Sequence, residues 1–297
     1  MFKCRSTSVT AGRFVRRLTG GSQAMLVDAS DGRQYVVKFA NNPQGPNVLC
    51  NEALGTELYR ALGLPVPEWT TVLIPRTFLL RYPNCSMAKF NSGVELETGL
   101  CFGSRVVAAP AGRIYEMLPG SFIRRVANRS DFWLAWLVDL CADHRDNRQS
   151  IFTEYSSGLH AIFVDHGHMF GGPDGSRKTP LTGPRYWDTR VYALPDAEKI
   201  SRRLRRISST LDTDRLFKRM QEIPEAWLVE SALENFHTCI ERLCRADYLE
   251  KTFEEVLAAF ENSYANGRAI PQLEHSEHPA LLCSHLRAGS AGRQAIA

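Results

Sequence analysis

Short apolar runs bounded by turn-forming residues dominate the first third of the chain, whereas apolar residues recur at helical spacing through the second half. The apolar runs at 24–27 and 34–40 flank Asp31-Gly32, and this arrangement predicts a β-hairpin. Further strands are predicted at residues 69–74, 103–109 and 113–119. Residues 75–98 are rich in turn formers and are interpreted as an insertion.

Helices are predicted where apolar residues fall on one stripe. The first spans residues 47–62, and Gly63 follows it as a stop signal. Ser130 is a suitable N-cap for a second helix. The apolar stripe of that helix, which we expect in the core, consists of Trp133, Trp136, Leu137 and Leu140. Later helices are predicted at residues 196–210, 213–223, 227–245 and 249–264.

This order of elements predicts an α+β fold with two domains and a tail. Residues 1–118 would form a β-rich first domain, and residues 119–271 a helical second domain. Residues 272–297 are rich in Ser, Gly, Ala and His, so we expect a loose tail there. A chain of 297 residues with 44% hydrophobic composition is long enough to bury a sizeable core.

Charge and cysteine content narrow the functional classes. Thirty-six basic and thirty-two acidic residues give a net charge of +4, and this excess of positive charge is too small to indicate a nucleic-acid-binding protein. The basic run 202–206 is interpreted as a solvated helix face. The eight cysteines form no C-x-x-C pair, and the longest apolar segment, 132–142, is too short to cross a membrane. The start of the chain lacks the apolar core of a signal peptide, so we expect a cytoplasmic protein with no membrane or nucleic-acid partner.

The candidate chemistry lies between residues 142 and 170. Asp146 stands in a polar loop, Gln149 follows three residues later, and Asp165 ends the apolar run 161–164. Strands at 150–152 and 161–164 would pair as a hairpin and bring these polar side chains together. Phosphoryl transfer needs a residue that positions the nucleophile and ligands for Mg²⁺ bound to nucleotide phosphates. We therefore expect Asp146 to position the nucleophile, and Gln149 and Asp165 to bind Mg²⁺.

Two triplets resemble the protein-kinase signatures H-R-D and D-F-G. They are His144-Arg145-Asp146 and Asp165-His166-Gly167. Upstream, Lys38 ends a predicted strand and Glu52 lies early in the next helix, which is the order of the kinase pair that orients the nucleotide phosphates. Glu57 is the competing glutamate, and spacing alone does not decide between the two. His144 is interpreted as orienting the backbone of the catalytic loop.

Taken in register, six segments resemble the HipA-like kinase family, in particular stand-alone bacterial HipA-like domains. They run from about residue 13 to 192 and comprise Gly20-Gly21-Ser22-Gln23, Tyr35-Val36-Val37-Lys38-Phe39, Asn51-Glu52, Gly63-Leu64-Pro65-Val66-Pro67, Asp146 with Arg148-Gln149, and Val164-Asp165-His166-Gly167. The resemblance implies a bilobal protein-kinase-like fold, ATP and Mg²⁺ as cofactors, and transfer of the γ-phosphoryl group, in the best-known relatives to a protein serine.

The resemblance also implies roles for individual residues. Lys38 would bind phosphates with Glu52 as its partner, Asp146 would be the base, and Asp165 a metal ligand. The loop Gly20, Gly21, Ser22 and Gln23 would cover the phosphates, the hinge to the adenine would span Glu116 to Leu118, and residues 171–184 would take the place of an activation segment. Many relatives place an Asn five residues after the base, whereas here Gln149 stands at three. We expect the chain to lack the additional N-terminal subdomain of the toxin relatives, so the resemblance does not imply a toxin role.

Several alternatives stay open at this stage. Asp143 is a rival base, with Arg148 five residues after it. The Gln149 departure allows a pseudokinase that binds a nucleotide or a partner without catalysis. The acceptor could be a protein or a small hydroxylated molecule. A metallohydrolase would use His144, Asp165, His166 and His168, but these lack the helical spacing of zincins.

Overall fold

The computed structural model describes residues 8–107 apart from 84, 86, 90 and 91, together with residues 113–175, 186–192 and 197–265. The expected tail at 272–297 lies outside the described residues, as do residues 176–184 of the expected activation segment. Helices and strands are both abundant, which confirms the α+β composition.

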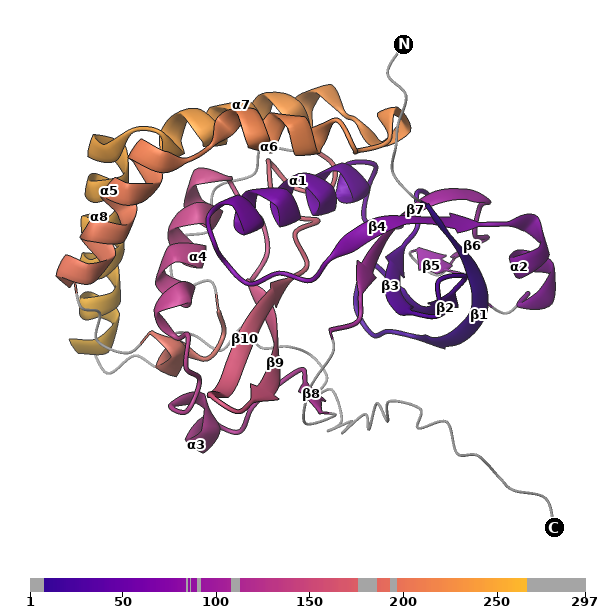
Figure 1. The fold of residues 1–297 in the computed structure, drawn as a ribbon, viewed down its shortest axis with the longest axis horizontal. Coiled ribbons are helices and arrows are strands. Elements are labelled where there is room, and N and C mark those ends of the chain that lie inside the picture. The colour runs from indigo at the N-terminus through magenta and orange to yellow at the C-terminus, as the bar shows by residue number, and fades with distance from the viewer. Residues whose placement is uncertain are drawn as a thin grey trace.

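A closed five-stranded barrel forms the first part of the molecule (Figure 1). Its strands, in spatial order, are β1 (Val9–Arg17), β2 (Met25–Ala29), β3 (Gln34–Lys38), β7 (Gly99–Arg105) and β4 (Trp69–Ile74). β4 closes the barrel by pairing in parallel with β1, and the other pairs are antiparallel. Met25, Val27 and Val37 are fully buried, because alternate side chains of each strand face the inside.

The sequence located most of this barrel correctly. β2 and β3 form the predicted hairpin, with Val27 opposite Tyr35. The strand predicted at 103–109 begins earlier, at Gly99, because Gly103 lies inside the strand and not at its start. A Cβ at Gly103 would lie 2.3 Å from Val72 Cγ2, so only glycine allows β4 and β7 to pack this closely. The turn-rich insertion contains short elements that the sequence did not reveal, namely α2 (Arg76–Arg81), β5 (Met87–Lys89) and β6 (Ser92–Val94).

The first long helix, α1 (Val48–Ala61), lies against the barrel and is covered on its other side by helices from the end of the chain (Figure 1). Every residue from Val48 to Tyr59 is buried, including Asn51, Glu52 and Glu57. Gly63 follows the helix with φ +72°, the left-handed conformation that terminates helices. α1 is therefore an internal element whose polar residues must all find partners within the protein.

A second sheet follows the barrel, in the order β10 (Gly158–Val164), β9 (Gln149–Tyr155) and β8 (Ile114–Tyr115). β9 and β10 form the predicted hairpin, and Val164 pairs with Gln149. The prediction that residues 113–119 form the last strand of the first domain was wrong, because β8 pairs with β9. The barrel ends at Arg105, so the change of sheet comes before the predicted domain boundary at 118.

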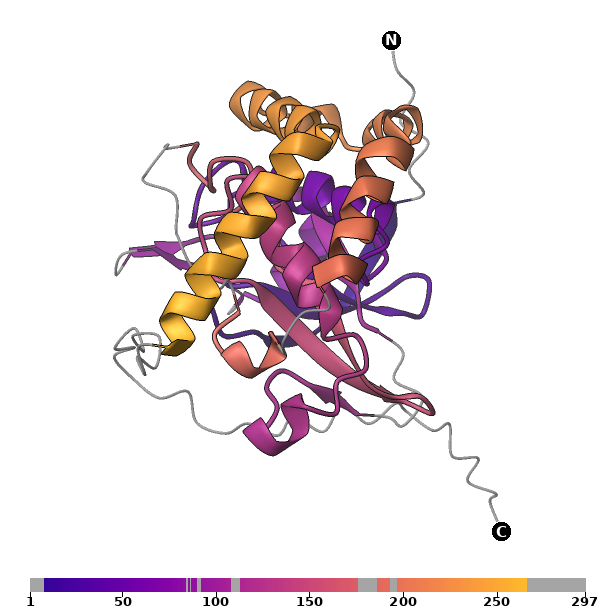
Figure 2. The same cartoon turned by 90° about the vertical axis from the view of Figure 1, so that its left-hand side faces the viewer.

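Helices make up most of the remaining described chain, and several of them pack against one another and against α1 (Figures 1 and 2). They are α3 (Gly120–Ile123), α4 (Ser130–Cys141), α5 (Ala197–Thr210), α6 (Thr213–Met220), α7 (Glu230–Leu243) and α8 (Ala246–Ala265), with short 3₁₀ turns η1 (Thr189–Val191) and η2 (Glu225–Trp227). Ser130 is the first residue of α4 and not its N-cap. Trp133 and Trp136 stack in the core, as the stripe predicted. Within the described residues, no helix has the length and hydrophobicity to cross a membrane.

Candidate functional site

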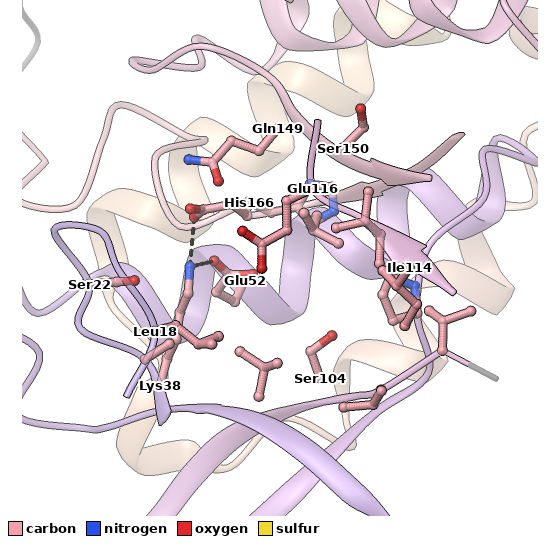
Figure 3. Close-up of a pocket in the computed structure, with 18 of the residues that line it drawn as sticks. Leu18, Ser22, Lys38, Glu52, Ser104, Ile114, Glu116, Gln149, Ser150 and His166 are labelled. Carbon is pink, nitrogen blue, oxygen red and sulfur yellow. Dashed lines mark hydrogen bonds and ion pairs between the residues drawn. The ribbon is translucent and has the colours of Figure 1, made fainter. Parts of the chain in front are cut away.

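A cavity of about 410 Å³ lies between the barrel and the second sheet (Figure 3). Its walls are largely apolar, with Leu18, Ala24, Leu26, Val36 and Phe102 from the barrel and Ile114, Ile151 and Val164 from the second sheet. This volume suits a small organic ligand. Two apolar walls that face each other favour a flat ring between them.

Three charged side chains meet at the polar end of the cavity, each from a different element. Lys38 comes from β3, Glu52 from α1 and Asp165 from the end of β10. Lys38 Nζ lies 2.6 Å from Asp165 Oδ1. It also bonds Glu52 Oε1, as a dashed line in Figure 3 shows. Lys38 and Glu52 are almost fully buried, whereas the Asp165 side chain is 23% exposed. The three elements thus present one ammonium between two carboxylates.

Burial and charge act in opposite directions on these groups. Burial alone lowers the pKa of Lys38, but Asp165 and Glu52 outweigh it and raise this pKa above its ordinary value. Burial raises the pKa of Asp165, but Lys38 reverses this and leaves the pKa well below normal. The pKa of Glu52 is raised, chiefly by burial. Lys38 is therefore protonated and Asp165 ionised at neutral pH.

Glu57, the competing glutamate, lies elsewhere in the same helix. Its carboxylate bonds Arg60 and Trp69 Nε1, and Arg219 of α6 lies 3.3 Å away. Glu57 therefore fixes α1 to the barrel and to α6, and Glu52 alone of the two glutamates reaches Lys38.

The turn after β10 is bound directly to α1. Gly167 N donates to Glu52 Oε1 at 2.8 Å, and Asn51 Nδ2 donates to the Gly167 carbonyl at 3.0 Å. A Cβ at Gly55 would lie 2.6 Å from His166 Cβ, so a glycine is required where the helix meets the turn. The sequence analysis did not identify Asn51 or Gly55 as contacts of this turn. For Gly55 a signal was available, because a glycine inside an otherwise regular helix often marks a close contact.

Backbone strain is concentrated in the loops that border this site. Four described non-glycine residues have positive φ: Gln23 at 46°, Asp143 at 50°, Asp165 at 61° and Phe170 at 53°. Such conformations cost energy and persist only where the surrounding structure enforces them. Their positions, in the β1–β2 loop and in the two loops at the end of the β9–β10 hairpin, are typical of a functional site.

The loop between α4 and β9 contains both candidate bases. Asp143 Oδ2 is held by Arg145 at 2.5 Å, whereas Asp146 Oδ1 accepts a hydrogen bond from Asn147 N at 2.7 Å. His144 is fully buried, and its backbone N donates to the Asp139 carbonyl. The cavity wall includes Asn147 and Gln149 but neither aspartate. An arginine thus neutralises Asp143, and Asp146 remains the better candidate for a base.

One protein-family match covers the first part of the chain. Residues 13–117 match the HipA-like kinase family. The match covers about a third of the chain, and it confirms the resemblance predicted from the motifs. The family match includes Lys38 and Glu52 but ends before Asp146 and Asp165. No curated protein matches the chain significantly.

The chain is similar to solved structures of kinases. The Helicobacter pylori proinflammatory kinase CtkA superposes with a TM-score of 0.52 at 13% identity, covering 84% of this chain and 99% of CtkA. Hydra Fam20, solved with sugar, has a TM-score of 0.49 at 14% identity, and the match covers 86% of this chain and 87% of Fam20. The Golgi casein kinase with Mn/ADP bound has a TM-score of 0.48 at 12% identity, and the match covers 84% of this chain and 73% of the casein kinase. The likeness to CtkA shows that the chain has a kinase-like fold.

Against this fold, the other residues predicted for the nucleotide site divide into two groups. Ser22 and Glu116 line the cavity. Gly20, Gly21 and Gln23 lie in the same β1–β2 loop but outside the cavity wall. Leu118 is buried in the hydrophobic core and is not part of the wall. The wall instead includes residues 104–107, at and just after the end of β7, which the sequence analysis did not assign to the nucleotide site.

The four residues of the metallohydrolase alternative do not converge on one point. His144 and His166 are buried in the interior, while His168 Nε2 lies 2.9 Å from Gln44 Nε2. Within the described part of the chain, no group of three or more His, Cys, Asp or Glu side chains could hold a metal ion.

Proposed function

We propose that the chain is an ATP- and Mg²⁺-dependent phosphotransferase, a HipA-like serine/threonine protein kinase. The observation that supports this most is Lys38 held between Glu52 and Asp165 at the polar end of an apolar cavity. A lysine fixed by a helix glutamate beside an aspartate is the arrangement that positions nucleotide phosphates in kinases. The kinase-like fold and the family match support the same proposal.

The cavity walls and the loops suggest how ATP binds. The adenine would lie between the apolar walls, beside residues 104–107 and Glu116. The β1–β2 loop, from Gly20 to Gln23, would cover the phosphates, with Ser22 nearest to them. In this proposal the barrel with α1 forms one lobe, and the chain from β8 onward forms the other.

The residues at the end of the β9–β10 hairpin suit a divalent cation. Asp165 supplies an ionised carboxylate, and Gln149, exposed at the start of β9 opposite Val164, supplies an amide oxygen. Mg²⁺ bound with ATP would neutralise the charge that develops on the phosphoryl oxygens. Asp146 would accept the proton of the attacking hydroxyl, from a position at the edge of the cavity next to Asn147.

A pseudokinase is the second candidate, and one observation favours it. Arg148 directly precedes Gln149, and its side chain is buried in a pair with Asp139. A guanidinium cannot bind a metal, and the amide of Gln149 one residue later is attached to a longer, more flexible side chain than Asn. Such a site would bind nucleotide but transfer phosphate weakly or not at all.

The deciding experiment is phosphoryl transfer from labelled ATP by the full chain. The purified protein would be incubated with lysate proteins and, separately, with metabolites across Mg²⁺ and Mn²⁺ titrations, and Lys38→Met would serve as the matched control. A labelled protein that depends on Lys38 supports the protein kinase, and a labelled metabolite supports a small-molecule kinase. ATP binding by thermal shift without any labelled product would establish the pseudokinase. Absence of ATP binding would refute both proposals.

A further inference from the structure

Arg148 is among the largest side chains that are fully buried in the described structure. It forms a bidentate pair with Asp139 of α4, with Nε 3.0 Å from Oδ2 and NH2 2.5 Å from Oδ1. Both side chains are at most 1% exposed. Burying such a pair gives little or no net stability compared with apolar side chains of the same size. Fold stability alone therefore does not account for it.

The remaining nitrogen of Arg148 points at the turn that carries Asp165. NH1 lies 3.2 Å from the Val164 carbonyl, 3.3 Å from the Asp165 carbonyl and 3.2 Å from His166 Nδ1. Asp165 itself has φ 61°, a conformation that is unfavourable for a non-glycine residue. The guanidinium thus binds both peptide oxygens that flank the strained Cα.

The same guanidinium links this turn to α1. It lies over the Tyr59 ring at 4.8 Å, and Tyr59 Oη donates to Asp139 Oδ1 at 2.7 Å. The Tyr59 ring also contacts the His166 ring, with centroids 4.6 Å apart. Through Tyr59, the helix that supplies Glu52 is packed against the arginine that holds Asp165.

From these contacts we infer that Arg148, paired with Asp139, is a positioning residue that holds the Asp165 carboxylate toward the cavity for the metal–nucleotide complex. Arginine suits this task because its rigid fork binds Asp139 with two nitrogens while the third reaches the turn. Lysine has a single nitrogen and cannot do both. The inference rests on the proposed nucleotide-binding function, and it concerns how the metal dependence of that binding arises.

The test compares binding of ADP with Mn²⁺ and binding of ADP alone in EDTA, both by calorimetry on the full chain. Arg148→Met by itself leaves Asp139 buried without its cation and is expected to unfold the protein. The informative variants are therefore Arg148→Lys and the double variant Asp139→Leu with Arg148→Met, which removes both charges. Arg203→Met is the matched control, because Arg203 pairs at 2.6 Å with Asp131, an aspartate of the same helix as Asp139 but at its other end.

We expect both informative variants to bind ADP with Mn²⁺ at least about tenfold more weakly, the usual effect of removing a residue that orients a metal ligand. Binding of ADP alone should stay within about twofold of the wild type, and Arg203→Met should leave both affinities unchanged. Near-ultraviolet circular dichroism would confirm that the variants are folded. Equal losses with and without Mn²⁺, or no loss at all, in a folded variant would show that Arg148 is only structural. A wild-type protein that binds ADP under neither condition would instead refute the proposed function.

Discussion

The ammonium group of Lys38 lies 2.6 Å from Oδ1 of Asp165, although 127 positions separate the two residues along the chain. Lys38 ends a barrel strand, and Asp165 directly follows a strand of the second sheet. The pair therefore joins the two parts of the molecule at the point where we propose that the phosphates and the metal bind.

Asp165→Asn tests the metal side of this pair. Removing the negative charge should weaken the binding of nucleotide with Mn²⁺ or Mg²⁺ by about tenfold, or about 1.4 kcal/mol. Most of the gain in affinity that the metal provides would then be lost. Binding of metal-free ADP should persist, because Lys38 keeps Glu52 as its partner. Calorimetric titrations with and without metal measure both quantities. Unchanged metal-dependent affinity would exclude Asp165 as a ligand.

Lys38→Met and Glu52→Gln should each lower kcat while the fold is retained, and the double variant should lose less than the sum of the two losses. The reason is that the two side chains share one ion pair, and residues that act as a unit give non-additive effects. Glu57→Gln is the control within the same helix, and we expect its kcat to match the wild type. Steady-state kinetics on the wild type and the four variants measure these effects. Additive losses, or a slow Glu57→Gln enzyme, would show that the wrong pair has been chosen.

Asp146→Asn should lower the rate of transfer by roughly 10²- to 10⁴-fold, which is the usual contribution of a general base. ATP affinity should be preserved, because Asp146 does not line the cavity. Asp143→Asn should do comparatively little, since its carboxylate is already bound by Arg145. Single-turnover assays separate the chemical step from binding. A larger effect at Asp143 would reverse the assignment of the base.

Gly55→Ala should destabilise the protein by about 1–3 kcal/mol, the typical cost of overpacking, despite the better helix propensity of alanine. The added Cβ would lie 2.6 Å from His166 Cβ and 2.7 Å from Met169 Sδ, so α1 and the turn at 165–167 must separate. Nucleotide affinity should fall as well. Gly12→Ala is the control, because its Cβ would meet only the Asp28 carbonyl at 3.6 Å. Urea unfolding gives the stabilities, and equal values for the two variants would contradict the proposed close contact.

Glu57 predicts a specific dependence of stability on pH. Burial raises the pKa of Glu57, but Arg219, Arg60 and Trp69 outweigh it, so the folded pKa lies below the ordinary value of 4.5. A lowered carboxylate pKa stabilises the folded state above the unfolded pKa, and this stabilisation is lost as the pH falls through the folded pKa. The unfolding free energy of the wild type should exceed that of Glu57→Gln by a constant amount at neutral pH. This difference should shrink below about pH 4.5, as urea unfolding at several pH values would show. A difference that grows in acid would contradict the assignment.

Local sequence patterns predicted the elements of this fold well. Trp69–Ile74 is a strand with the predicted limits, the Asp31-Gly32 hairpin forms, and the helices after residue 196 lie close to their predicted positions. These predictions depend on turn chemistry and on the period of apolar residues, which are properties of neighbouring positions. The same local signals could not show that Gly103 lies within a strand, because its role depends on Val72 of another strand.

The sequence by itself determined which residues carry the candidate chemistry, since Lys38, Glu52, Asp146 and Asp165 stand in a recognisable order. Only the tertiary structure decided which of them meet. In the structure Lys38 pairs with Glu52, whereas Glu57 pairs with Arg219. β8 belongs to the second sheet, and Arg148 donates to the Asp165 carbonyl. The physical reason is that an ion pair or a strand pairing depends on distances in space, and residues far apart in the chain approach each other only when the barrel, α1 and the second sheet pack together.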